Sequence, residues 1–149
     1  MRFSDVLEPP RGHFILEVRR KGIIVPELCM DRPNLIVNGS KQVHAKLLGG
    51  SVTNQSVTTI GYGTNGTAPT TGDTALTAAF TKAVDSTTYP ASNQVQFAFS
   101  LASTEDNGAA IMEFGLLTAG GTLYARVTRS VALNKASDIS FSGTWAINF

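Results

Sequence analysis

The sequence predicts a mainly β protein, an antiparallel β-sandwich or jelly-roll-like domain with one short helix, preceded by an extended N-terminal arm and a hairpin. Apolar and polar residues alternate in residues 95–101, 112–116, 123–127 and 139–149, and a period of two is typical of strands with one buried face. The composition agrees, because 14 glycines and a charged fraction of only 15% favour turn-rich β structure. At 149 residues the chain is long enough to bury one core.

Residues 1–33 form the first predicted unit, an N-terminal arm followed by a β-hairpin. Pro9, Pro10 and Gly12 interrupt any periodicity in the arm, and the apolar runs 13–19 and 23–28 flank a basic turn. Because two strands are only marginally stable in water, we expect this hairpin to lie on another protein. The expected partner-binding residues are Phe14, Leu16, Arg19, Arg20, Lys21, Ile23 and Val25.

Residues 34–50 form the second unit, a connector with a short helix at about residues 41–48. Ser40 is a suitable N-cap residue, and Gly49 stands where many helices end in a left-handed residue. His44 lies within this helix, and the residue one turn later is Leu48 and not a second metal ligand. We therefore expect a structural role for His44 and no metal site.

Residues 51–149 form the third unit, the β-sandwich domain. The hairpin within residues 110–127 is its clearest local pattern, because Gly120 and Gly121 can both take positive φ without steric cost, as tight turns require. A loop is expected at residues 64–74 and a helical turn at 75–80. The expected strands are residues 57–63, 82–89, 94–101, 110–117, 122–131 and 139–149.

No group of residues has the spacing of a catalytic, metal or cofactor site. The segment from Gly61 to Gly66 matches a dinucleotide-binding glycine pattern, but a loop composition follows where that site needs a helix. The adjacent Glu105 and Asp106 stand beside an Asn-Gly turn, where solvated charges are common. We therefore predict a protein that is not an enzyme and that has no cofactor.

Cys29, Tyr62 and Tyr89 each have a functional and a structural interpretation. Cys29 is the single cysteine and can form no internal disulfide, and its neighbours favour a small buried residue over a reactive thiol. The two tyrosines stand beside Gly and Pro at expected loop edges, where stacking on a sugar ring competes with an ordinary turn position. The structural interpretation is favoured for all three residues.

The charge distribution and the absence of targeting signals restrict the partners. Residues 1–48 hold eight Lys or Arg against five Asp or Glu, a net charge of +3, and residues 49–149 hold four against six, a net charge of −2. An acidic partner would therefore meet the front of the chain. No N-terminal apolar signal region or window of ~18 apolar residues is present, so we expect no membrane partner. We expect no nucleic-acid partner either, and the overall charge of +1 by itself neither favours nor excludes one.

Several short motifs from Asn34 onward are distinctive together, and they are Asn34-Leu-Ile-Val-Asn-Gly, Leu47-Leu-Gly-Gly, Ile60-Gly-Tyr-Gly-Thr-Asn-Gly-Thr-Ala-Pro, Gly72-Asp-Thr-Ala-Leu-Thr, Glu113-Phe-Gly-Leu-Leu-Thr, Gly121-Thr-Leu-Tyr-Ala-Arg and Ser140-Phe-Ser-Gly-Thr-Trp-Ala-Ile. With these motifs, residues 35–149 resemble small structural proteins of tailed bacteriophages. The resemblance implies a virion protein made in the cytoplasm of the host bacterium. A capsid cement or decoration protein, which binds and stabilises the major capsid protein or other virion proteins and forms a homo-oligomer, is the first interpretation.

Two other functions remain as alternatives to a cement protein. A tail, fibre or baseplate component is the second interpretation. A carbohydrate-binding module or a glycan-degrading enzyme, with a host glycan as its partner, is the third and the less favoured. The number of copies in each particle would separate the first two, and binding of the purified protein to polysaccharide would favour the third.

Overall fold

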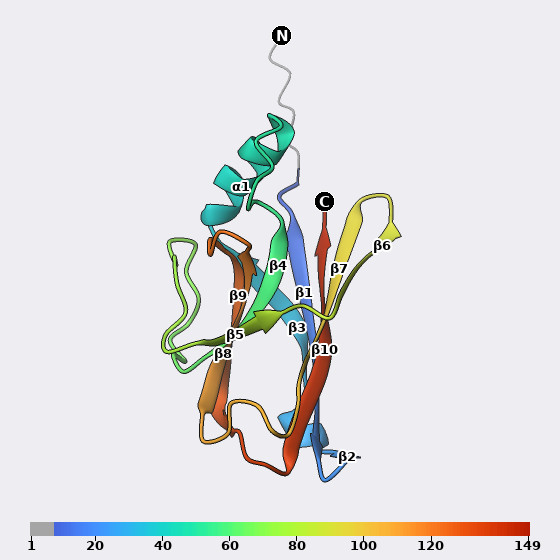
Figure 1. Cartoon of the computed structure of the whole chain (residues 1–149), viewed down its shortest axis with the longest axis vertical. Helices are drawn as coiled ribbons and strands as arrows, with labels where there is room; N and C mark the ends of the chain where they lie inside the picture. Colours follow the sequence, from blue (N-terminus) through green and yellow to red (C-terminus); the bar gives the residue numbers. More distant parts are fainter. Residues whose placement is uncertain (1–7) are drawn as a thin grey trace.

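The computed structural model describes residues 8–149, which form one antiparallel sheet that curls into a half-barrel (Figure 1). Nine strands follow one another across it in the order β5-β4-β8-β9-β3-β1-β10-β7-β6, and the short β2 pairs with β1. The mainly β fold and the short helix are confirmed, whereas the two-sheet sandwich or jelly-roll-like arrangement is wrong. The elements are β1 (Arg11–Arg20), β2 (Ile23–Ile24), η1 (Pro26–Leu28), β3 (Met30–Ile36), α1 (Gly39–Leu48), β4 (Val57–Gly63), β5 (Phe80–Ala83), β6 (Ser86–Ala91), β7 (Gln94–Leu101), β8 (Ala110–Thr118), β9 (Leu123–Asn134) and β10 (Ile139–Asn148).

Strand β3 is the reason that the protein has one curled sheet and not two. Most of β3 pairs with β1, and its last residues, Leu35 and Ile36, pair with Arg126 and Ala125 of β9. This short ladder joins the two halves of the sheet. No strand was expected here, because residues 30–34 lack alternation and include a proline. That proline is tolerated because only one edge of β3 is paired at its position.

Strand β1 lies in the middle of the sheet, between β10 and β3. It pairs with β10 along its whole length, and its inward-facing residues Phe14, Leu16 and Val18 are buried. One sheet and one core thus combine strands from residues 1–33 and 51–149, which we expected to be separate units. The predicted arm lies outside the described residues at positions 1–7.

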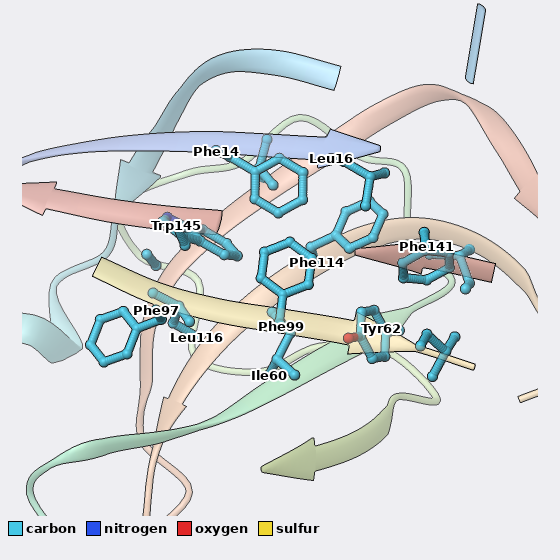
Figure 2. Packing of buried hydrophobic residues seen from close by; sticks show 14 of the residues in the cluster. Phe14, Leu16, Ile60, Tyr62, Phe97, Phe99, Phe114, Leu116, Phe141 and Trp145 are labelled. Atoms are coloured by element: carbon cyan, nitrogen blue, oxygen red, sulfur yellow. The ribbon is translucent and has the colours of Figure 1, made fainter. Parts of the chain in front are cut away.

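The core is an aromatic cluster on the inner face of the curled sheet, to which Phe14 and Phe114 both belong (Figure 2). The ring of Phe14 lies 5.4 Å from that of Phe99, 5.0 Å from that of Phe114 and 4.8 Å from that of Trp145. Gly143 allows β10 to approach its neighbours closely, because a Cβ there would overlap a backbone oxygen of β1 and lie 2.6 Å from the ring of Phe99. Aromatic burial of this kind stabilises the half-barrel without a second sheet.

Most other elements lie close to their expected positions, with three differences. The N-cap of α1 is Asn38, and Ser40 is buried in the first turn of the helix. Residues 75–80 form no helical turn, and Phe80 begins β5. The single strand expected at residues 82–89 is divided between β5 and β6, because the chain leaves β4 and crosses to β7 between them.

Candidate functional site

The turn between β1 and β2 forms one end of the half-barrel (Figure 1). Its two central residues, Lys21 and Gly22, have φ of 50° and 78°, as the tight turns of twisted hairpins require. The backbone N–H of Lys21 donates to the carbonyl oxygen of Asp138 at 2.8 Å, and that of Val25 donates to Val18 at 2.9 Å. The turn is therefore fixed to the loop before β10 and presents its side chains in defined positions.

The seven expected partner-binding residues fall into three groups, which are buried, half-buried and exposed. Phe14 and Leu16 are 0% and 1% exposed and face the core, so they cannot contact a partner in this fold. Val25 is half-buried. Ile23 is 73% exposed, and its neighbour Ile24, an apolar residue of the same hairpin that is not among the seven, is 45% exposed. The basic residues of the turn are exposed as well, and they are Arg19, Arg20 and Lys21.

Carboxylates neutralise two of the three basic side chains at this turn. Arg19 Nη2 lies 2.6 Å from Glu17 Oε1, and Arg20 Nε lies 3.6 Å from Asp138 Oδ2. Within residues 8–149, Lys21 has no carboxylate at ion-pair distance. The strongly basic character expected from the sequence is therefore reduced, and the exposed isoleucines are the more distinctive feature of this end.

Residues of α1 and of the β6–β7 hairpin line a groove of about 710 Å³. These elements lie at the end of the half-barrel opposite β2 (Figure 1). Val43, Phe97 and Ile147 contribute an apolar floor, whereas neutral polar side chains from three segments form much of the rim. None of the described residues that line the groove is Asp, Glu, Lys or Arg. The rim contains Gln55, Ser56, Thr58, Thr87, Ser92, Asn93 and Gln94.

Aromatic side chains form one wall of this groove. His44 Nε2 and the Tyr124 hydroxyl share a hydrogen bond of 2.7 Å, and the His44 ring lies 5.7 Å from the ring of Phe149. Asn93 Nδ2 donates to the Phe149 carbonyl oxygen at 2.9 Å, which fixes the aromatic residue in place. Burial lowers the pKa of His44 and raises the pKa of Tyr124 to about 12, so both side chains are neutral near pH 7.

A polar cluster that the sequence pattern did not indicate lies on the outer face of the sheet. Arg126 Nε donates to Glu113 Oε2 at 2.6 Å, and Nη1 donates to Asp73 Oδ2 at 2.8 Å. The other oxygen of Glu113 accepts hydrogen bonds from the backbone N–H groups of Asn65 and Thr77. Because every charge in the cluster has a partner, it fastens the loop between β4 and β5 onto the sheet and offers no free reactive group.

The other residues considered from the sequence have structural surroundings. Gly66 opens no helix, which agrees with the rejection of a dinucleotide site. Glu105 accepts from the backbone N–H of Ala102 and lies 3.0 Å from Lys82 Nζ, and these contacts lower its pKa. His13 pairs with Asp31 at 2.6 Å. Within residues 8–149, no three His, Cys, Asp or Glu side chains gather in a metal-binding arrangement.

Cys29 and the two tyrosines have different environments. Cys29 is half-buried, and its sulfur lies 3.4 Å from the backbone nitrogen of Val18. Tyr62 is buried in the core, and its hydroxyl donates to the Ser100 carbonyl oxygen at 3.1 Å. Tyr89 is 76% exposed at the mouth of the groove. Of the two tyrosines, Tyr89 is the one that a ligand can contact, and Cys29 lines a separate pocket of about 330 Å³.

Comparisons with protein-family models, with curated proteins and with solved structures find no match for this chain. In the part of the chain that the structure describes, no helix has the length and apolar character to cross a membrane.

Proposed function

We propose that this chain is a structural subunit of a tailed-phage virion and that it attaches to the major capsid protein as a cement protein, together with further copies of itself. The resemblance of residues 35–149 to small phage structural proteins supports this class. The observation that carries the attachment is the exposed pair Ile23 and Ile24, two large aliphatic side chains on a fixed turn. Exposed apolar side chains that are held rigidly are typical of surfaces that a partner covers.

Ile23 and Ile24 alone do not account for a stable contact. Full burial of one isoleucine side chain contributes about 1.5–3 kcal/mol. Two such side chains therefore give less than the ~8 kcal/mol of a micromolar complex. The contact must extend over neighbouring surface, which includes the exposed Pro26 and Glu27 of η1. A partner strand that pairs with the outer edge of β2 would add backbone hydrogen bonds.

The charges at this end contribute less to attachment than the apolar surface does. Glu17 and Asp138 lie beside Arg19 and Arg20, which leaves Lys21 as the basic group without a nearby carboxylate in the described chain. Exposed charges are screened by salt, whereas apolar contacts are not. We therefore expect attachment to particles to depend only weakly on ionic strength.

The double variant Ile23→Asp/Ile24→Asp tests the attachment surface. Both side chains are exposed, so the variant should keep the melting temperature of the wild type. Sedimentation with purified capsids made without this protein would measure the bound copies, and we expect at least a roughly tenfold weaker attachment, because two charges replace the apolar contact. The matched control is Val52→Asp, which changes a 56% exposed aliphatic residue beyond the other end of the molecule, after α1.

Two results would contradict this proposal. Equal attachment of the double variant and the wild type would show that the β2 surface is not the contact. Failure of the wild type to bind capsids, with a label on the protein found at the tail in electron micrographs, would replace the capsid assignment with the tail or baseplate interpretation. A cement protein should instead appear over the whole capsid in many copies.

A further inference from the structure

We infer that the groove beside α1 is a binding site for a neutral glycan. This inference does not depend on attachment to a capsid. If the β2 end does face a particle, the groove faces the medium, because the two lie at opposite ends of the half-barrel (Figure 1).

The charge of the lining restricts the occupant. No acidic or basic side chain lines the groove, and His44 is neutral near pH 7. A charged ligand would lose its hydration here and find no side chain of opposite charge. Anionic polysaccharides, nucleic acids and charged peptides therefore fit poorly, and a neutral ligand fits best.

Most of the lining surface is apolar, and the polar groups among it favour a sugar over a purely apolar protein segment. The lining includes three amide side chains, Gln55, Asn93 and Gln94, and hydroxyl groups of serine and threonine. Amides and hydroxyls both donate and accept hydrogen bonds, as sugar hydroxyl groups do. A purely apolar segment would remove this rim from water without replacing its hydrogen bonds.

The aromatic side chains of the groove would contact the apolar face of a sugar ring. Tyr89 is 76% exposed at the mouth of the groove, and Phe149 is 57% exposed beside His44 and Asn93. The face of an aromatic ring is electron-rich and attracts the polarised C–H groups on the flat face of a hexose ring. Since Phe149 is held by Asn93 and by the His44–Tyr124 pair, little ordering is needed when a ligand arrives.

The experiment uses the purified full chain and a panel of neutral oligosaccharides, namely maltohexaose, cellohexaose, chitohexaose and a galactomannan fragment. Binding would be followed by NMR at the His44 ring protons, with the chain's other histidine, His13, as an internal reference. Concentrations up to ~10 mM would detect a Kd of about 1 mM. At least one neutral oligosaccharide should bind and shift the His44 signals, whereas an alginate oligosaccharide should not.

Variants on β6 connect the binding to the groove. Tyr89→Ala should weaken binding at least tenfold, whereas Tyr89→Phe should retain it, because the ring face is kept. The matched control is Thr88→Ala, an exposed neighbour on the same strand that does not line the groove. Both positions changed, Thr88 and Tyr89, are exposed, so equal melting temperatures of the three variants would exclude an effect of unfolding.

Three outcomes would overturn the inference. The first is that no neutral oligosaccharide of the panel binds. The second is that binding persists unchanged in Tyr89→Ala, which would place the sugar elsewhere. The third is that Tyr89→Ala changes only self-association or attachment to capsids, which would make the groove a protein interface. Attachment to capsids is measured separately from glycan binding. If the protein does not bind capsids, the result of the glycan experiment is unaffected.

Discussion

Replacing Phe14 with alanine tests whether β1 belongs to the core of the free protein. The Phe14 side chain is 0% exposed and contacts the rings of Phe99, Phe114 and Trp145. Truncation of a buried phenylalanine to alanine costs about 3–5 kcal/mol, to which aromatic pairs contribute about 0.5–1.5 kcal/mol each. Since a domain has about 5–15 kcal/mol of stability in total, Phe14→Ala should lose a large share of it.

Urea unfolding followed by the fluorescence of Trp145 would measure this loss, because Trp145 is the single tryptophan and is buried in contact with Phe14. The matched control is Ile15→Ala on the same strand, where the side chain faces the other side and is 42% exposed. The control should lose less than about 1.5 kcal/mol. An equal, small effect of the two variants would refute the assignment of β1 to the core. It would favour the earlier expectation, in which the hairpin of residues 13–28 lies on another protein.

The polar cluster on the outer face leads to two further predictions. Arg126→Met leaves the buried Glu113 carboxylate without its cation and should cost about 3–5 kcal/mol in urea unfolding; a loss below ~1 kcal/mol would show that the pair does not hold the loop. Partial burial raises the pKa of Asp73, but hydrogen bonds from Thr70 and Arg126 outweigh it, so the pKa is lowered overall. Such a carboxylate stabilises the fold above the unfolded-state pKa of about 3.9, and the contribution is lost as the pH falls through the folded-state pKa. The difference in melting temperature between the wild type and Asp73→Asn should therefore be largest near neutral pH and shrink below about pH 4, and an undiminished difference in acid would contradict the assignment.

The strands with a clear period of two were predictable because each has one face on the core. The strand expected at residues 94–101 has those bounds as β7, and the C-terminal strand ends one residue earlier than expected, at Asn148. Strand β3 was not predictable, because its residues are held by ladders with β1 and β9 and not by an alternating pattern of their own. Without β3 nothing in the sequence connects the two halves of the sheet, and a sandwich is the natural expectation.

The candidate sites depend on residues that are distant in the sequence, which limits prediction further. The first hairpin was expected to need a foreign surface, but the surface that covers Phe14 comes from β7, β8 and β10 of the same chain. Glu113 and Arg126 alternate with core residues and so were expected to face solvent, whereas the loop between β4 and β5 covers them. The groove joins His44, Tyr89 and Phe149, and no local motif relates these three residues.

The pairing of β1 with β10 has a consequence for the synthesis of the protein. Arg11 of β1 lies opposite Asn148 of β10, so β1 cannot complete this pairing until β10 has left the ribosome. At ~5–20 residues per second, that wait lasts on the order of 10 seconds, during which the apolar side of β1 has no neighbour on one edge. Contacts of such large sequence separation also slow folding after release. A message truncated before the last strand would yield a chain with an open central edge, and such a chain should aggregate or be degraded before it folds.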